Sequence, residues 1–570
     1  MSYPPGQKFR VRNNGVGLVA DPNALPLVVG YAKGLTPNTL YQSSDVNTFK
    51  DLAESGPVLE TALAAILKSG AAMVLAIAAS TAATTSAVDA ARVDSSTGTV
   101  AVSGTPTLDF DAKVEITKTG AKGVGRFKYT FDGKTYAAER FIPLGGTFSP
   151  PGSDLTLTFT GTPTNGAVTQ TGTGPAVTVT GTPVGEYDFI VEITTGGAVD
   201  SAVFRWSSDG GATYTSGVTV AATVALGATG VTANFAAGTY VLAATYEWTS
   251  TTSVDADFEV GDVHSFTTTA PGHTTSDVAA GMSALKAQLG KRRVRRVILT
   301  GAQASAAAGA TMFAALATHM ATLEGDHYFG RAAMDAGGGT ADAYRSAFAA
   351  AADDRVAVTW KKARCVVRAY FDGYSDAWQP GIRAVAERIF EADLSENLGR
   401  VASGPMEWVT EIEHDEGVDQ QFVESDKVIT FRTNLGEDGF FVTNGYLKSP
   451  TGSDFLYWDW GCTVDELCEA ILFGQQKWLL SKLRSLKDGT GRLDKNEAVR
   501  IVNAIKGRIN AVLKDPINVE GQKGHVTDAD YAIDLTNDFL ATRTVRSSGR
   551  AIATSPAETF DTEVGLTRSI

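Results

Sequence analysis

Three stretches of the chain carry residue types that bind ions or phosphate in other proteins. The first, Lys487–Glu497, resembles a calcium-binding loop between helices, but Leu486 takes the first position, where such loops place a carboxylate. Losing that carboxylate removes an anchoring ligand. We therefore interpret the segment as a glycine turn followed by a helix cap made by Asp494 and Glu497, with calcium binding as the alternative.

The other two stretches also have simpler explanations. Asp132–Thr135 hints at a phosphate loop, but its first glycine would fall at Lys128, and an Asp-Gly pair is typical of a hairpin turn. His414, within Glu411–Glu416, could bind metal or act as a base, although a solvated acidic loop is the simpler reading. The sequence contains no G-x-S-x-G or H-E-x-x-H motif. We expect no enzyme activity, no catalytic residue, no metal and no cofactor.

A basic cluster, Lys291–Arg296, leads directly into the apolar run Val297–Leu299, so we expect some of its arginines to flank a strand. The acidic stretch Glu411–Asp419 could be its counterpart on a neighbouring molecule. Two unrelated solvated patches are the simpler hypothesis.

Composition limits the classes of partner. The net charge of -14 argues against a nucleic-acid partner, because such proteins usually carry a basic excess. Three cysteines are too few for a disulfide framework, so we expect free thiols. The most apolar run, 71–79, is too short to cross a bilayer, and the start of the chain has no secretory pattern. We expect a soluble protein without stable membrane insertion.

The last eleven residues alternate in character. Apolar side chains stand at even positions and polar residues or glycine stand between them, which is typical of a half-buried strand. The apolar set is Phe560, Val564, Leu566 and Ile570. The polar run Arg546–Arg550 precedes this strand as a tether. Such a strand folds back on its own sheet or completes a sheet in another molecule.

Strands and helices alternate on both sides of residues 94–254, which predicts a largely parallel, covered sheet. Expected strands are 27–31, 73–77, 294–299, 327–334 and 356–360. Expected helices include one capped by Asp45, one from Pro57 closed by Gly70, and one over 277–289. Further along we expect strands at 428–431 and 439–442 and helices at 463–486 and 494–513.

A duplicated unit lies between these flanks. Val102–Pro106 recurs 77 residues later as Val179–Pro183, and Phe127–Tyr129 matches Phe204–Trp206 at the same offset. Both copies are rich in Val, Thr and aromatic residues, with turn signals, so each predicts a small β-sandwich.

The predicted fold class is therefore a discontinuous α/β (α+β) core with two tandem inserted all-β sandwich domains and extended terminal arms. The expected divisions are an N-terminal arm (1–22), the core (23–93 with 255–426), sandwich 1 (94–177), sandwich 2 (178–254), a C-terminal α+β domain (427–545) and a C-terminal arm (546–570).

The outer segments resemble the sheath proteins of contractile phage tails and related injection systems, and the order of the pieces carries the likeness. The opening is similar at Asn14–Leu18, Leu27–Tyr31 and Ser43–Val46, and the return to the core at 261–285. The C-terminal domain is similar at Ile429–Arg432, Gly439–Gly445 and Ser453–Phe455. The inserted sandwiches fall where these proteins vary in size.

The resemblance implies a mechanical role in a virion tail that assembles in the host cytoplasm. Family members polymerise helically around a tail tube and contract to drive it through the target envelope for genome ejection. It implies as partners further copies of the chain, the tail tube protein, and baseplate and tail-terminator or neck proteins. Terminal arms add strands to sheets of adjacent subunits. The C-terminal arm here would be Phe560–Ile570, and the N-terminal arm, near 9–19, would use Phe9 and Val11.

The main alternative is a virion or cell-surface adhesin that binds glycans through its sandwiches. Its candidate sugar platforms are Trp206, Trp248, Tyr187 and Tyr214. The simpler hypothesis is that these rings fill the sandwich cores, because Trp206 aligns with Tyr129 in an expected strand.

Overall fold

The computed structural model describes residues 24–131, 133, 136–151, 153–290, 292–365, 377–518 and 521–554. The described chain divides into two compact units. The first comprises the described residues up to Ala83 and those from Ala270 onward, and the second comprises the described residues of Thr84–Thr269.

A six-stranded sheet forms the centre of the first unit, in the order β2-β3-β1-β24-β25-β26. The strands are β1 (Ala24–Gly30), β2 (Thr39–Ser43), β3 (Ala72–Ala76), β24 (Arg293–Leu299), β25 (Arg331–Asp335) and β26 (Val356–Thr359). Only the edge strand β2 is antiparallel to its neighbour. The expected parallel sheet is confirmed.

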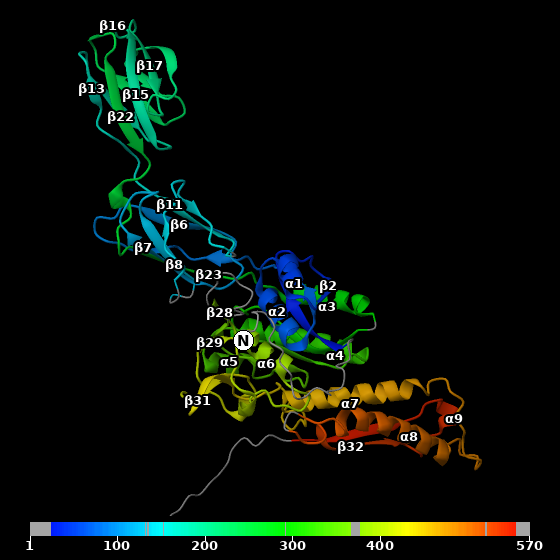
Figure 1. Cartoon of the computed structure of the whole chain (residues 1–570). Helices are drawn as coiled ribbons and strands as arrows, with labels where there is room; N and C mark the ends of the chain where they lie inside the picture. Colours follow the sequence, from blue (N-terminus) through cyan, green and yellow to red (C-terminus); the bar gives the residue numbers. More distant parts are fainter. Residues whose placement is uncertain are drawn as a thin grey trace, which may run out of the picture. The chain divides into compact units, whose positions relative to one another are not determined.

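Helices cover both faces of this sheet, so the strands are buried on both sides. The helices are α1 (Val46–Ala53), α2 (Pro57–Ser69), α3 (Thr275–Leu289), α4 (Ala306–Gly325), α5 (Ala341–Ala347) and α6 (Gly381–Glu391). The edge strand β2 and the helices α1 to α6 are labelled in Figure 1. Neighbouring strand residues point to opposite cores: Val28 and Val74 pack with α2 and α6, whereas Leu27 and Met73 pack with α3 and α4.

The predicted helix ends are confirmed where local chemistry sets them. Asp45 accepts a hydrogen bond from the backbone N–H of Thr48 at 2.7 Å. Gly70 closes α2 in the left-handed conformation. One expected strand was placed too early: β25 begins at Arg331, because His327 (φ 66) still belongs to the turn that ends α4.

Helix α4 is long and apolar enough, by length and composition alone, to cross a membrane. Its large side chains Met312, Phe313, Leu316 and Met320 are buried in the core beside the sheet. This is the pattern of a core helix.

The second unit consists of two groups of antiparallel strands. β-Module 1 contains β4 (Thr84–Thr85), β5 (Asp89–Ala91), β6 (Thr99–Gly104), β7 (Asp111–Lys118), β8 (Arg126–Thr130), β9 (Arg140–Phe141), β10 (Thr147–Phe148), β11 (Leu155–Thr160) and β23 (Val263–Thr269). β-Module 2 contains β12 (Thr164–Asn165), β13 (Thr169–Thr171), β14 (Val177–Gly181), β15 (Tyr187–Thr195), β16 (Gly197–Ala198), β17 (Val203–Ser207), β18 (Thr215–Thr219), β19 (Thr223–Ala225), β20 (Val231–Phe235), β21 (Thr239–Tyr240) and β22 (Thr245–Thr251).

The strand pairing shows one module inserted inside the other. β23, which follows β-module 2 in sequence, pairs with β7 as β22 pairs with β15. β12 and β13 pair with β22, so 164–171 belongs to β-module 2. The expected boundaries 94–177 and 178–254 therefore need correction. The repeat could not show this, because the last strand of the first copy is displaced by the length of the second.

The C-terminal part of the first unit is a helical layer under a two-stranded sheet. It contains α7 (Trp458–Gln476), α8 (Lys495–Ile509) with a π-helical extension (Asn510–Lys514), β32 (Val526–Ile533), α9 (Phe539–Thr542) and β33 (Ser547–Ala553). We call these elements the C-terminal layer. The expected helix 463–486 was misplaced: Leu479 and Leu480 beyond its observed end are exposed, so no packing extends the helix.

Smaller elements join the sheet to this layer. They are β27 (Lys362–Cys365), β28 (Ala377–Pro380), β29 (Val409–Ile412), β30 (Phe431–Asn434) and β31 (Glu437–Val442). Ile429, Phe431 and Val442 are buried in the same core as α2 and α6. This part of the expected C-terminal domain 427–545 therefore packs with the core.

Candidate functional site

The two-stranded sheet of the C-terminal layer is the candidate site for strand addition. β32 and β33 are antiparallel, and within the described residues no third strand pairs with either outer edge. One face packs on α7 and α8 through Val526, Ala529, Tyr531 and, partly, Ala551. Alternate residues face outward and are exposed, among them Arg550 and Ile552. An open-edged sheet fixed on helices is the structure to which a further strand can add.

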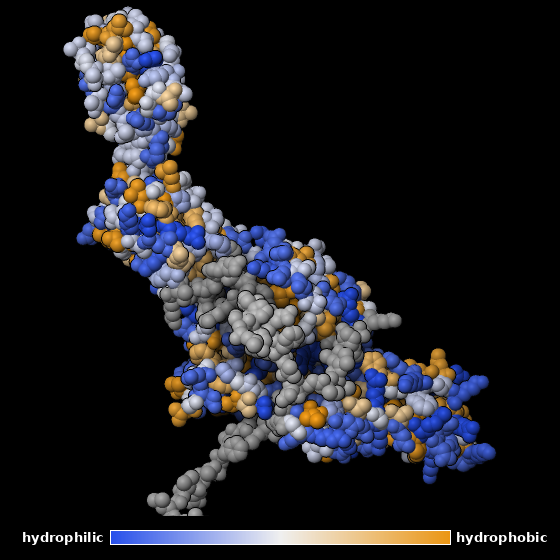
Figure 2. Space-filling view, viewed as in Figure 1, coloured by the Kyte–Doolittle hydropathy of each residue, from blue (hydrophilic) through white to orange (hydrophobic). Residues whose placement is uncertain are grey.

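The two edges differ in what surrounds them. Asp528 and Asp530 are exposed on β32, and Lys514 and Lys506 reach them at 2.6 and 2.5 Å. These ion pairs hold the pKa of both carboxyls below its usual value, through the hydrogen bond from each lysine. Lys506 lies on α8 and Lys514 on its π-helical extension, whereas no described ion pair involves a side chain of β33. The face in view in Figure 2 is correspondingly hydrophilic over much of α8 and β32.

The end of β33 is tied to the start of α7. The indole Nε1 of Trp460 donates to the carbonyl of Thr554 at 2.7 Å. At the other end of the strand, Gln475 donates to the hydroxyl of Ser547 at 3.1 Å. β33 thus runs antiparallel to α7, and hydrogen bonds from this helix hold the strand near both of its ends.

The residues predicted for strand exchange lie beyond that point or before the first strand. Phe9, Val11, Phe560, Val564, Leu566 and Ile570 all lie outside the described residues. The expected tether Arg546–Arg550 is corrected, because residues 547–553 form β33. The run is polar because Ser548 and Arg550 are exposed while the backbone pairs with β32. Gly549 also lies close to Ile471 of α7, where a Cβ would come within 2.3 Å.

The basic cluster of the sequence holds the C-terminal layer to the central sheet. Arg293 and Arg295 on β24 pair with Glu469 of α7 at 2.5 and 2.9 Å, and Arg295 also pairs with Glu466 at 2.6 Å. Arg296 donates to the backbone carbonyls of Ile389 and Ala392 at the end of α6. Arg293, Arg295 and Arg296 thus have their partners within the chain, which contradicts for these three both the solvated patch and the intermolecular partner.

A second part of this contact involves buried acids. Arg331 of β25 pairs with Asp465 of α7 at 3.1 Å. Burial raises the pKa of Asp465 to about 6 and that of Asp459 to about 7. Desolvation thus opposes the charge of both acids, and Arg331 favours the charged form of Asp465.

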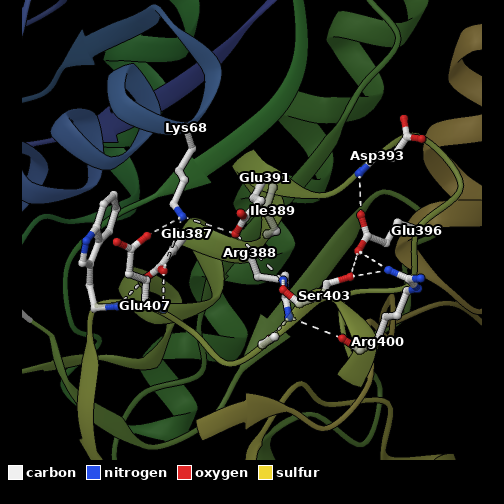
Figure 3. Close-up of polar contacts among 12 residues, drawn as sticks. Lys68, Glu387, Arg388, Ile389, Glu391, Asp393, Glu396, Arg400, Ser403 and Glu407 are labelled. Atoms are coloured by element: carbon white, nitrogen blue, oxygen red, sulfur yellow. Dashed lines mark hydrogen bonds and ion pairs between the residues drawn. The ribbon is translucent and has the colours of Figure 1, made fainter. Parts of the chain in front are cut away.

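Buried charges also fix α6 within the core (Figure 3). Lys68 of α2 points at three carboxylates, those of Glu387 (4.0 Å), Glu391 (3.4 Å) and Glu407 (3.1 Å). Arg388 donates to backbone carbonyls of the loop at 400–404. A helix buried on all sides needs such partners, because an unpaired charge there would be strongly destabilising.

The acidic stretch around His414 is folded and not freely solvated. Glu411 pairs with Arg364 at 3.2 Å, and Glu413 pairs with Lys361 at 3.0 Å. His414 Nε2 lies 2.9 Å from Glu416 Oε2, and its ring packs edge-on against Trp360. These contacts correct the expectation of a solvated loop.

The other ion-binding candidates take ordinary turn structures. Asp488 accepts hydrogen bonds from the backbone and hydroxyl of Thr490, and Asp494 caps α8 as predicted. Within the described ranges no cluster of three or more His, Cys, Asp or Glu is placed to hold a metal. Gly133 has a φ of 71, whereas Asp132, Lys134 and Thr135 lie outside the described residues.

The aromatic residues proposed as sugar platforms belong mainly to the core of β-module 2. Trp248 is buried and stacks on Phe189 with ring centroids 4.9 Å apart. Trp206 and Tyr187 are partly buried against the same cluster. Tyr214 lies under the guanidinium of Arg205 at 4.3 Å.

Sequence reasoning missed β32 and the ties of α7. For β32 a signal existed, since Ala529, Tyr531 and Ile533 alternate with exposed residues. A bulge between Val526 and Asp528 shortens that alternation. The partners of α7 have no local signal, because the paired residues are far apart in sequence.

Comparison with known proteins gives distant structural likeness. No family model and no curated protein matches the sequence. Among solved structures, the sheath tail protein Lin1278 from Listeria innocua is similar, at 6% identity and a TM-score of 0.39, over 93% of this chain and 95% of that one. A chain of the anti-feeding prophage baseplate is similar at 12% identity and a TM-score of 0.38, over 53% of this chain and 76% of that one.

Proposed function

We propose that the chain is a structural subunit of a contractile tail sheath. It polymerises helically with further copies of itself around a tail tube and contracts to drive the tube through an envelope for genome ejection. The proposal rests on the sequence resemblance of the outer segments, and on one structural observation above all. A two-stranded sheet, packed by one face on α7 and α8, has no partner strand on either edge among the described residues.

The chain itself supplies strands of the required kind. Phe560–Ile570 alternates apolar and polar residues, and it follows Thr554, which Trp460 fixes at the end of β33. The N-terminal segment with Phe9 and Val11 is the second arm. Two arms and two open edges let each subunit donate to its neighbours and accept from them. Ordering a free arm costs conformational entropy that a single pairing does not offset, so assembly on a preformed tube is favoured over spontaneous pairing.

The remaining partners and the location follow from the same proposal. They are the tail tube protein, the baseplate, and tail-terminator or neck proteins, in a virion tail assembled in the host cytoplasm. The subunit has no enzymatic role and needs no cofactor, nucleic acid or membrane. The adhesin alternative is less favoured, because Trp248 and Phe189 form part of the core of β-module 2.

The test is polymerisation of the full-length chain, followed by negative-stain electron microscopy with and without its tail tube. Striated hollow tubes or stacked rings are expected with the tube present. Removal of residues 557–570 should leave a folded monomer that forms neither. Normal sheaths from this truncation would refute the arm model, and monomers in the presence of a polymerised tube would refute the sheath function.

A matched pair of variants separates strand pairing from loss of mass. Val564→Asp with Leu566→Asp places two charges on the apolar side of the arm, and should abolish polymers. Thr567→Asp with Ser569→Asp places the same charges on the polar side, and should polymerise. Equal behaviour of the two double variants would contradict a half-buried strand.

A further inference from the structure

β-Module 2 connects to β-module 1 by a narrow neck. Its two segments are Gly161–Pro163, which leaves β11, and Thr252–Val254, which follows β22. A neck of two short segments would by itself let one module swing on the other. The hydrogen bonds around it are therefore the feature that decides its mobility.

One buried carboxylate binds both neck segments. Asp257 has no exposed surface, and its Oδ2 accepts from the backbone N–H groups of Thr162 (2.8 Å) and Val254 (2.7 Å) and from the hydroxyl of Ser253 (2.9 Å). Its Oδ1 accepts from the hydroxyls of Thr162 (2.6 Å) and Thr97 (2.7 Å). Thr97 precedes β6, so the same group reaches β-module 1.

The segment that carries Asp257 is itself anchored in β-module 1. Phe258 is fully buried, and its ring packs edge-on against Phe159 of β11. The buried carboxylate of Asp262 accepts from the backbone N–H of Val93 at 2.7 Å and from the hydroxyl of Ser96 at 2.5 Å. The anchor is thus part of the module and not of the neck.

Packing leaves little room for other arrangements. A Cβ on Gly161 would lie 2.4 Å from the hydroxyl oxygen of Ser253 and 2.6 Å from Oδ2 of Asp257. The two neck segments therefore approach each other as closely as glycine allows. Despite burial, hydrogen bonds hold the pKa of Asp257 below its usual value, so the group is charged at neutral pH.

We propose that Asp257 fixes the connection between the two modules. Its carboxylate holds both segments of the neck to β-module 1, so that the two modules move as one rigid body. Alanine at this position would remove all five hydrogen bonds. An amide would not, because its oxygen can replace Oδ2 and its NH₂ can donate to the hydroxyls of Thr162 and Thr97. The proposal concerns the inserted modules and does not depend on the sheath function.

The test is the distance distribution between spin labels in the full chain, measured by pulsed electron resonance. Labels at exposed strand positions, Thr99→Cys in β-module 1 and Thr178→Cys in β-module 2, report on the joint, in a background where Cys468 is Ser. We expect a narrow distribution for the otherwise unchanged chain and at least a twofold broader one for Asp257→Ala.

The matched control is Asp255→Ala, two residues away. Asp255 is exposed and accepts only a long contact of 3.3 Å from the N–H of Ala121 within the described residues, so its loss should leave the distribution narrow. An unchanged width in Asp257→Ala would overturn the proposal. So would a broad distribution in the unchanged chain.

A second variant covers the case in which Asp257→Ala fails to fold. Thr162→Val keeps the carboxylate and removes a single hydroxyl donor from the neck. It should give an intermediate width, with the tryptophan fluorescence of β-module 2 unchanged. A distance distribution as narrow as that of the unchanged chain would overturn the proposal.

Discussion

Arg295 on β24 donates a 2.9 Å hydrogen bond to Glu469 on α7, although 174 residues separate them in the chain. Arg293 joins the same carboxylate at 2.5 Å. The central sheet and the helical layer that carries β32 and β33 are thereby held by charge as well as by apolar packing. A pull on a strand added to β32 or β33 would be transmitted through α7 to the sheet.

Removing the shared carboxylate should loosen α7. Glu469→Gln leaves two arginines facing an uncharged group, and we expect a loss of about 2 to 4 kcal/mol in local stability. Hydrogen exchange of α7 amides measures this loss. The control is Asp342→Asn, which breaks an exposed ion pair with Arg345 and should cost less than about 0.5 kcal/mol. Equal protection of α7 in both variants would contradict the role of the pair.

The stability of α7 should fall as pH rises from about 4 to about 7. Burial raises the pKa of Asp459 from 3.8 to about 7. In this window the folded chain keeps a proton that the unfolded chain has lost, so rising pH favours unfolding. Asp459→Asn cannot ionise, so at pH 8 the α7 amides of this variant should be better protected from hydrogen exchange than those of the unchanged chain, by on the order of 2 kcal/mol. At pH 4 the difference between the two should be much smaller.

Asp528 provides the control of opposite sign. Its pKa is lowered by the hydrogen bond from Lys514, so its contribution is present at neutral pH and lost as pH falls below the usual carboxyl range. Asp528→Asn should therefore weaken protection of β32 at pH 8, and weaken it less as the pH falls through the acid range. A gain in protection at pH 8 from Asp528→Asn would contradict this assignment.

The tie between Trp460 and Thr554 should matter more for assembly than for folding. Trp460→Phe removes the indole donor, and we expect a loss of only about 1 kcal/mol in the protection of β33. Because the chain then leaves β33 less firmly fixed, polymers should form several-fold more slowly on a tube. Trp478→Phe is the matched control, since Nε1 of Trp478 has no hydrogen-bond partner among the described residues. Equal polymerisation rates would show that the tie has no part in assembly.

Much of the secondary structure was predictable, because its causes lie within a few residues. Asp45 and Gly70 set helix ends through their own side-chain and backbone chemistry. The buried runs at β1 and β24 indicated a parallel sheet covered on both faces. The predictions were wrong where tertiary packing sets the secondary structure: α7 ends earlier than expected, and β33 forms from a polar run.

The candidate site was predictable only in part. Alternation from Phe560 to Ile570 indicates a strand, but the sheet it would join was not recognised, since a bulge interrupts the alternation of β32. Ala529 and Tyr531 face α8 only because Ile501 and Ile505 give them a surface to pack on.

By itself, the sequence determined the alternation of strands and helices, the helix caps and the duplicated β-unit, because periodicity and capping act over short distances along the chain. Only the tertiary structure decided that Arg293 and Arg295 meet Glu469, and that β23 completes β-module 1 after the whole of β-module 2. Contacts of this kind depend on which surfaces the packed elements bring together. Residue types near the paired positions do not encode that choice, because many other pairings satisfy the same charges and the same hydrogen bonds.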